Sequence, residues 1–510
     1  MMEIPQITTI LSWTLLCSSF AYAHDEFELV DDGAVLARDG SDTSFASVIN
    51  IPDWILPANR ADATAEYYMY YANHSGMHIY MKWAPSLEGP WTSYNLGGTY
   101  NGQSRRGVLD MEADSTRDDY DHLAGPDAHA DDANQRIILY YHGKNQPSTT
   151  TPGGTNVPSK HSNFVATSPY GLNFNDPLHA GGESGHGPVT VTHDTVTRDV
   201  ALGEDYQRIF EYKSNYYSVS KRAILNMAAD YNDPWTPPAS NPFNEVWIEE
   251  DTPTNLWTFD ANPNGQDNYY SPAATFLASS EFENHPNNPL PGEAVLSNGS
   301  SERMNHTCAN VLADEELLEV YFYVRSDPGD RFDDIYRIVL DVSEPDFQDW
   351  TVAINGSTGE YRFDVVATSE DVKAAVETAH PGGVDPVLYA DPSSLGAPSI
   401  FIDEDGSKYL FYTYYSAVLG GNSSPSEGQI SAIKLLPPAA RANSIAPQGG
   451  GVVLQGTGKA NTGYTVMSST DLDQWDPIGS GWFDEFGNST KFMPVDPEDE
   501  RRFYLFDPQF

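Results

Sequence analysis

Four polar residues in the first half of the chain have types and spacing suited to chemistry on a sugar acid: His142, His161, Tyr206 and Arg222. They lie 19, 45 and 16 residues apart, in a region of short strands and turns. A neutral imidazole can remove the proton beside a carboxylate, and a second imidazole or a phenol can protonate the departing oxygen. A guanidinium can bind the carboxylate and stabilise the charge that develops on it. The set predicts β-elimination from a uronate, provided that all four residues meet in one cleft.

The sequence around these residues places several of them at strand ends. His142 ends a strand of alternating residues and is followed by Gly143, and His161 begins the next strand. Lys221-Arg222 follows a strand in a chain with only 27 basic residues. We therefore predict catalytic roles for His142, His161, Tyr206 and Arg222, and substrate contacts for Tyr141, Tyr206 and Arg222.

The order and spacing of these four residues resemble the ulvan lyases of polysaccharide lyase families twenty-four and twenty-five, and the spacing is closest to the latter. The segment Asp127–Arg136, which precedes the His142 strand, is also similar to that superfamily. The resemblance implies a seven-bladed propeller that cleaves ulvan, a sulfated green-algal polysaccharide of rhamnose 3-sulfate and uronic acids. It implies that His142 and His161 accept and donate protons and that Arg222 neutralises the uronate carboxylate. It further implies that Tyr206 binds the substrate or shares the proton transfer.

The elements that must position these residues are strands. Alternating aromatic and β-branched segments closed by Gly, Pro, Asn or Asp dominate the chain, such as Lys408–Tyr415, and the few predicted helices are short, such as Ser369–Glu377. Three segments share one plan, in which a strand ends near a Ser, a tight turn follows and an aromatic residue returns to the core: Ala84–Trp91, Ala166–Phe174 and Met467–Trp475. Such a repeat predicts an all-β fold built as a single β-propeller. The length of the chain favours seven blades with long loops.

Composition limits the location and the partners of the protein. The apolar run Ile7–Phe20 and the pattern Ala21-Tyr22-Ala23 predict a cleaved signal peptide over residues 1–23. Residues 24–510 are then expected to form one secreted or periplasmic catalytic domain. The net charge of −46 argues against nucleic acid and anionic membranes as partners. We expect a monomer that binds an anionic sulfated polysaccharide, of marine origin, in a locally basic cleft.

A second group of residues could bind a metal. Cys17 belongs to the predicted signal peptide, so Cys308 stands alone in the mature chain and no internal disulfide is expected. On a strand, His306 and Cys308 would point to one face as two ligands of a structural zinc, and His285 could join them. The alternative is a buried thiol beside a core histidine. Calcium at the acidic turn Asp127–Asp132 is the weaker metal prediction, and no organic cofactor is expected.

Two other functions stay open. One is a glycoside hydrolase on a five-bladed propeller, with carboxylates such as Asp127 or Glu211 in its cleft. The other is a non-catalytic propeller whose tyrosines stack on glycans. His129, beside several aspartates, is the main rival of the predicted catalytic histidines. Replacing Arg222 by Asn should abolish a lyase and scarcely affect most hydrolases.

Overall fold

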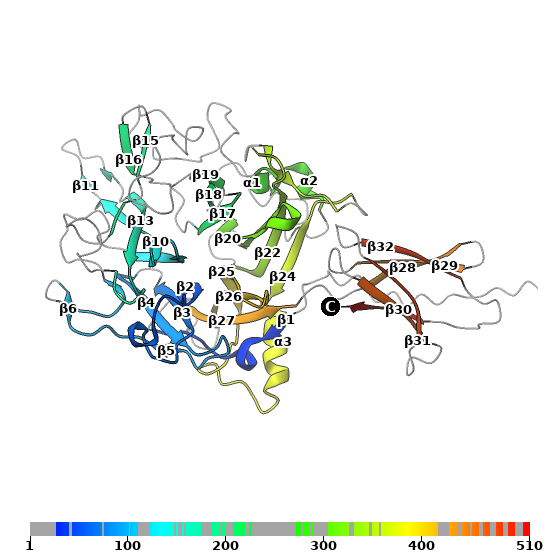
Figure 1. Cartoon of the computed structure of the whole chain (residues 1–510), viewed down its shortest axis with the longest axis horizontal. Coiled ribbons are helices and arrows are strands. Elements are labelled where there is room, and N and C mark those ends of the chain that lie inside the picture. Colours follow the sequence, from blue (N-terminus) through cyan, green and yellow to red (C-terminus); the bar gives the residue numbers. More distant parts are fainter. Residues whose placement is uncertain are drawn as a thin grey trace, which may run out of the picture.

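A computed structural model gives the arrangement of most strands of the 510-residue chain (Figure 1). The residues that it describes are 27–39, 43–73, 76–100, 103–110, 123–146, 149–150, 156–157, 160–174, 186–188, 190–193, 196–199, 208–213, 215–219, 224–226, 272–277, 279–285, 288, 304–325, 331–345, 349–355, 359–416, 428–436, 441–448, 451–457, 463–469, 476–482, 488–494 and 503–509. The predicted signal peptide lies outside them. Strands dominate the described residues, so the all-β prediction is confirmed. None of the helices in those ranges is long and apolar enough to cross a membrane.

Sheets one and two come from the first third of the chain. Sheet one has the order β2-β3-β4-β5, with β8 also paired to β4. Its strands are β2 (Thr43–Asn50), β3 (Tyr67–Asn73), β4 (His78–Ala84), β5 (Thr92–Ser93) and β8 (Leu109–Asp110). Sheet two has the order β9-β10-β13-β14. Its strands are β9 (Leu123–Asp131), β10 (Arg136–Gln146), β13 (Lys160–Ser168) and β14 (His186–Pro188).

Three two-stranded ribbons accompany these sheets. They are β6 (Thr99–Tyr100) with β7 (Gln103–Ser104), β11 (Thr149–Thr150) with β12 (Asn156–Val157), and β15 (Thr190–His193) with β16 (Val196–Asp199).

Sheets three and four follow along the chain. Sheet three contains β17 (Arg208–Tyr212), β18 (Asn215–Val219) and β19 (Ile224–Asn226) in that order. Sheet four has the order β20-β21-β22-β23, with β24 also paired to β22. Its strands are β20 (Met304–Leu312), β21 (Leu317–Arg325), β22 (Arg331–Asp341), β23 (Thr351–Val352) and β24 (Phe363–Thr368).

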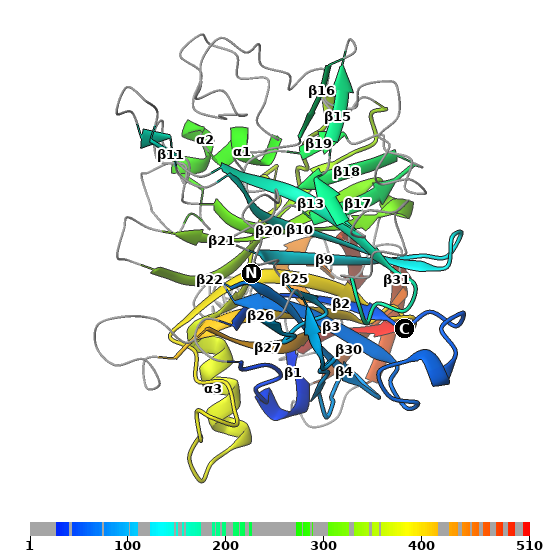
Figure 2. The same cartoon turned by 90° about the vertical axis from the view of Figure 1, so that its left-hand side faces the viewer.

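Sheet five joins the two ends of the ring of sheets. It contains β25 (Ser394–Ile402), β26 (Lys408–Tyr415) and β27 (Gly428–Leu435), and its fourth strand is β1 (Phe27–Leu29) from the start of the described chain. Phe27 pairs with Leu435 and Leu29 with Ile433. Figure 2 shows β1 beside β27 at the edge of this sheet. The backbone hydrogen bonds of this pairing close the ring at residue 435.

The C-terminal strands form two further sheets. One contains β28 (Arg441–Gln448), β29 (Gly451–Thr457) and β32 (Asn488–Pro494), and the other contains β30 (Gly463–Ser469), β31 (Asp476–Trp482) and β33 (Phe503–Gln509). In Figure 1 they lie to one side of sheets one to five. Our prediction of a single domain over residues 24–510 stays a prediction.

Helical segments are small. They are α1 (Pro272–Leu277), α2 (Ser280–Glu283), α3 (Ser369–Ala379) and the 3-10 turns η1 (Val30–Gly33), η2 (Pro57–Asn59) and η6 (Ala313–Glu315). The helix α3 begins after Thr368, whose Oγ1 accepts a hydrogen bond from the Asp371 N–H at 3.0 Å. Such a cap satisfies one of the free N–H groups of the first turn.

The core lies between sheets rather than inside one of them. Apolar clusters join sheet one to sheet two, sheet three to sheet four, sheet four to sheet five, and sheet five to sheet one. The first strands β2, β20 and β25 contact one another in turn, β2 contacts β9, and β17 contacts β20. Four sheets of four or five strands are thus arranged like propeller blades, and the three-stranded sheet three lies between sheets two and four.

Seven blades are not confirmed in the described part of the chain. Our prediction divided the whole chain among blades, whereas the pairing of β1 with β27 closes the ring before residue 441. The predicted turn is present in the repeat Ala166–Phe174, where Phe174 returns to the core at 0% exposure. At this turn, the Ser168 Oγ accepts a hydrogen bond from the Gly171 N–H at 3.1 Å. Gly171 has φ +73° and a Cβ there would lie 2.2 Å from the Tyr70 hydroxyl, so the turn requires glycine.

Candidate active site

The first strands of four sheets share a bulge near the axis of the ring. Each bulge contains one residue with positive φ, and the register of the strand shifts there. These residues are Phe45 (φ 67°) in β2, Gly125 (59°) in β9, His306 (42°) in β20 and Ala397 (41°) in β25. Two residues after them come Ser47, Asp127, Cys308 and Ser399, all buried. A bulge re-aims side chains, and the side chains of Ser47, Asp127 and Cys308 contact the backbone of a neighbouring sheet.

Those side chains bind the backbone of the next sheet. The Ser47 Oγ of sheet one accepts a hydrogen bond from the Ala128 N–H of sheet two at 2.9 Å. One sheet further, the Asp127 Oδ2 accepts one from the Ile209 N–H at 2.7 Å. Sheets one, two and three are therefore joined around the axis by the same kind of contact, which also fixes the start of β17 beside β9.

Arg208 lies at the centre of this arrangement. Its side chain is 10% exposed, and its guanidinium donates to the Ala46 carbonyl at 3.0 Å and to the Pro126 carbonyl. Its Nη1 also lies 3.5 Å from Asp127 Oδ1. Burial alone would raise the pKa of the Asp127 carboxyl, but His129, Arg208 and the Ile209 N–H together hold that pKa below its ordinary value. Asp127 is therefore an ionised anchor of the axis.

The histidine His129 belongs to the same anchor. Its Nε2 lies 2.8 Å from Asp127 Oδ2, and its ring packs edge-on against Tyr140 with centroids 5.9 Å apart. The other aspartates of this turn are engaged as well, since Asp131 accepts from Arg136 Nε at 2.8 Å and Asp132 accepts from Trp54 Nε1 at 2.8 Å. These contacts connect the acidic turn to neighbouring residues of the protein. Calcium binding at this turn stays a prediction.

The two predicted catalytic histidines occupy neighbouring strands of sheet two. His142 pairs with Asn163, and His161 pairs with Lys144. Since opposite residues in an antiparallel pair share a face and side chains alternate along a strand, positions 142 and 161 lie diagonally on one face. His142 is buried, with only 1% exposed, and this burial is the finding that weighs against its predicted role.

The face that carries His142 is turned toward sheet three. Ile137, Leu139 and Tyr141 of β10 belong to the apolar cluster between sheets one and two. Alternation then places His142 on the opposite face. Tyr141 itself is 2% exposed inside that cluster. This burial weighs against its predicted contact with substrate, which stays a prediction.

Tyr206 and Arg222 lie outside the described residues, and their predicted roles stay predictions. Described strands flank both of them. Strand β17 begins at Arg208, two residues after Tyr206, and Arg222 comes between the end of β18 at Val219 and the start of β19 at Ile224. Val219 pairs with Arg208. The start of β17 and the end of β18 are therefore one edge of sheet three, which adjoins sheet two through Asp127.

The predicted zinc ligands are separated by the bulge of β20. Register shifts between Asn305 and Cys308, so the simple alternation that would align His306 with Cys308 does not hold. His306 packs against Phe45 and Tyr323, with ring centroids 4.9 and 5.3 Å away. Within the described ranges no three His, Cys, Asp or Glu side chains are grouped as a metal site would need.

The thiol of Cys308 is buried among apolar side chains at 5% exposure, and burial raises its pKa to about 12. His285 lies elsewhere, packed against Phe276, Phe282 and Phe363. Cysteine binds zinc as a thiolate, and among the described residues Cys308 belongs to no group of three candidate ligands. Zinc at His306 and Cys308 stays a prediction.

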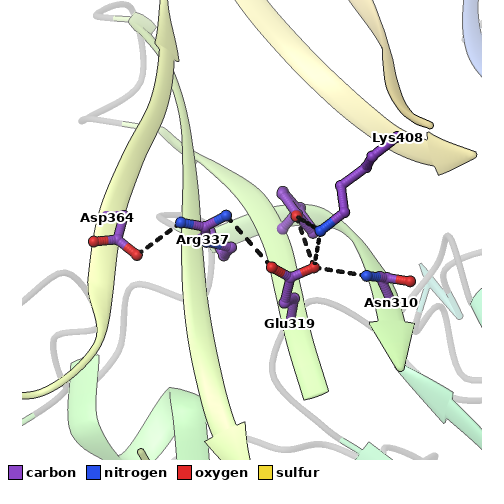
Figure 3. Close-up of polar contacts among 6 residues, drawn as sticks. Asn310, Glu319, Arg337, Asp364 and Lys408 are labelled. Atoms are coloured by element: carbon purple, nitrogen blue, oxygen red, sulfur yellow. Dashed lines mark hydrogen bonds and ion pairs between the residues drawn. The ribbon is translucent and has the colours of Figure 1, made fainter. Parts of the chain in front are cut away.

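A buried charge cluster joins sheets four and five (Figure 3). Glu319 of β21, only 4% exposed, accepts from Lys408 Nζ of β26 at 2.6 Å and from Asn310 Nδ2 at 2.6 Å, and Arg337 Nη1 lies 3.4 Å away. Arg337 also donates to Asp364 at 3.0 Å. Burial would raise the pKa of Glu319, but Arg337 and Lys408 hold it at about 2. No sequence pattern predicted this cluster, because its members lie on five different strands.

Comparison with known proteins gives distant similarities. No family model matches the chain. An uncharacterized protein of Acanthamoeba polyphaga mimivirus is 28% identical over 141 residues, which are 26% of this chain. The match spans 35% of the length of that curated relative.

Among solved structures, the chain is similar to an alpha-L-arabinofuranosidase from Lactobacillus brevis (12% identity, 74% of this chain, 87% of that chain, TM-score 0.37). It is also similar to a thermostable family-43 glycoside hydrolase (10% identity, 82% of this chain, 95% of that chain, TM-score 0.38). A third similar structure is an endo-1,5-alpha-L-arabinanase from Thermotoga petrophila (10% identity, 92% of this chain, 96% of that chain, TM-score 0.35). At these identities and TM-scores, none of them assigns a fold or a function to this chain.

Proposed function

We propose that the protein is a polysaccharide-cleaving enzyme whose site lies where the adjoining edges of sheets two and three meet. The observation that supports this most is the register of β10 and β13, which puts positions 142 and 161 on the face turned toward sheet three. The edge of sheet three that carries the start of β17 adjoins it. The described strand ends that flank Tyr206 and Arg222 in the sequence, namely the start of β17 and the end of β18, belong to that edge of sheet three.

The reaction that we propose is β-elimination from a uronate, with ulvan as the first substrate to test. His142 and His161 exchange protons with C5 and with the departing oxygen, and Arg222 neutralises the carboxylate, with Tyr206 beside it. Each general acid or base contributes about 10²–10⁴-fold to such a rate. Because His142 is buried, the proposal requires that substrate reach its ring from the side of sheet three. We also propose a secreted or periplasmic monomer.

Hydrolysis is the second candidate, and it is the activity named for the arabinofuranosidase and arabinanase above. Of the carboxylates that we named from the sequence, Asp127 does not suit the role of general acid. It is buried, bound by Arg208 and held ionised, whereas a general acid needs a raised pKa. Hydrolysis would therefore need another carboxylate as its acid.

The test is incubation of the full chain with ulvan, followed in two ways. β-Elimination produces an unsaturated uronate that absorbs ultraviolet light, and both reactions produce reducing ends. We expect absorbance and reducing ends to rise together, and Arg222→Asn to abolish both. Reducing ends without absorbance would replace the lyase proposal with hydrolysis. Activity that survives in both His142→Ala and His161→Ala would move the site elsewhere.

A further inference from the structure

A fixed backbone segment beside β4 presents an arginine to solvent. The Asp110 Oδ1, on a side chain only 6% exposed, accepts hydrogen bonds from the Arg106 and Gly107 N–H groups, both at 3.0 Å. His78 Nδ1 lies 2.6 Å from the same oxygen. A Cβ at Gly107 would lie 2.2 Å from the Ile79 carbonyl oxygen, so the segment is packed directly on β4. The backbone of Arg106 is therefore held in place while its side chain is exposed.

Arg106 differs from the cations that the structure places in ion pairs. Seven of them form ion pairs with carboxylates: Arg60, Arg136, Arg208, Lys213, Arg337, Lys373 and Lys408. The guanidinium of Arg106 has no ion-pair partner among the described residues. In a chain with 73 acidic and 27 basic residues, an exposed arginine on a rigid backbone without such a partner is unexpected for a solvated surface.

The surroundings of Arg106 are polar and aromatic. Burial raises the pKa of the Tyr80 phenol, Arg106 lowers it, and Asp39 and Asp110 raise it. The positive charge of Arg106 therefore interacts with the Tyr80 phenol. The charge of Asp110 is compensated locally, since two N–H groups and His78 surround it. What the segment offers to solvent is the positive charge of Arg106, next to the half-buried Arg105.

The segment is near the edge of sheet two that carries His142. The Leu123 N–H, at the start of β9, donates to the Gly76 carbonyl at 2.9 Å, and Gly76 comes two residues before His78. Leu123 itself pairs with Gly143, the neighbour of His142. With strands about 4.8 Å apart and residues about 3.3 Å apart along a strand, the path from Gly76 to His142 spans on the order of 10–15 Å, and the path from the Arg106 segment spans roughly 20–25 Å. A polymer chain bound at His142 can extend over such a distance.

We infer that Arg106 is an anion-binding subsite for the polysaccharide and takes a carboxylate or sulfate group of a sugar other than the one cleaved. The inference rests on the proposed function for the position of the cleavage site. An acidic protein repels an anionic polymer at long range, and a rigid arginine at the edge of the cleft provides local attraction. Guanidinium binds both carboxylate and sulfate oxygens through paired hydrogen bonds.

The test compares Arg106→Gln with Lys213→Gln. Both remove one exposed positive charge, but Lys213 lies in the β17–β18 turn and pairs with Glu316. Binding of ulvan is measured by calorimetry at low salt in the His142→Ala background, and initial rates are measured without that background. We expect Arg106→Gln to weaken binding and raise KM by about 5-fold with kcat unchanged. Lys213→Gln should change neither, and the effect of Arg106→Gln should fade at high salt.

Two modified polymers identify the bound group. If the effect of Arg106→Gln disappears with desulfated ulvan, the subsite binds sulfate, and if it disappears with carboxyl-reduced ulvan, it binds carboxylate. Equal binding by Arg106→Gln and Lys213→Gln, or no binding of ulvan at all, overturns the inference. Binding that depends on Arg106, without any cleavage, would refute the proposed function and leave the subsite standing. Cleavage of ulvan with binding that does not depend on Arg106 would refute the subsite and leave the proposed function standing.

Discussion

The cluster around Glu319 allows a quantitative prediction about the contact between sheets four and five. Replacing Glu319 by Gln keeps the shape of the side chain and removes its charge. Arg337 and Lys408 then lose the carboxylate that lies between them (Figure 3). Removing one partner of a buried ion pair is costly, because the remaining charge stays desolvated. The change should therefore weaken the propeller more than the loss of an exposed pair would.

The magnitude follows from the pKa of Glu319. It is about 2 in the folded chain against an ordinary value of 4.5. At about 1.36 kcal/mol per pH unit, this difference corresponds to about 3 kcal/mol of stability at neutral pH. Because the folded-state pKa is depressed, the contribution is complete above pH 4.5 and is lost as the pH falls toward 2. By about pH 3, roughly 2 kcal/mol of it should be gone.

Urea unfolding followed by tryptophan fluorescence measures this effect. At pH 7 we expect Glu319→Gln to unfold at a clearly lower urea concentration than the wild type. At pH 3 the difference in the free energy of unfolding between the two should shrink to roughly a third of its value at pH 7. The matched control is Glu316→Gln, which removes a carboxylate paired with Lys213 at 2.7 Å, with the two side chains 49% and 46% exposed. This control should unfold with the wild type. The reasoning is refuted if the two variants unfold alike or if the penalty of Glu319→Gln is the same at both pH values.

Three further predictions concern the axis and the proposed site. Arg208→Met should lower the free energy of unfolding by about 3–5 kcal/mol, because it leaves Asp127 buried without this guanidinium. Urea unfolding measures the change, and a loss below about 1 kcal/mol would contradict the prediction. Cys308 should not react with a thiol reagent at pH 8 until the chain unfolds, since burial raises its pKa to about 12, and fast labelling of the native chain would disprove this. His161→Ala should lower kcat on ulvan by about 10²–10⁴-fold with the fold intact by circular dichroism, and an unchanged kcat would exclude a catalytic role.

Local elements were predictable from the sequence because their signals are local. The alternation of Lys408–Tyr415 predicted β26 with its observed bounds, and the helix predicted from Ser369 begins there behind a Thr cap. The number of blades was not predictable. It depends on the pairing of β1 with β27, which joins residues about 400 positions apart through backbone hydrogen bonds that any side chain can make.

The candidate site was predictable only in part, for a similar reason. Spacing brought positions 142 and 161 to neighbouring strands, and the register places them on one face. Spacing could not say which face of β10 is the core, and so Tyr141 was assigned to the substrate although it packs between sheets. Arg106 had a usable signal, the doublet Arg105-Arg106 in a chain poor in basic residues. Arg208 had none, because its partners are carbonyl oxygens of Ala46 and Pro126.

The axial bulges explain why the internal repeat is faint in the sequence although it is clear in the structure. What recurs in β2, β9, β20 and β25 is a backbone conformation with positive φ, followed two residues later by a buried side chain. Phe45, Gly125, His306 and Ala397 fill the first position, so glycine is used only once although it would be least strained there. The rest of the ring must impose this conformation on the other three. Closure of the ring, more than any residue type, therefore sets the geometry beneath the proposed site, and a change that loosens closure should disturb the site before it disturbs the blades.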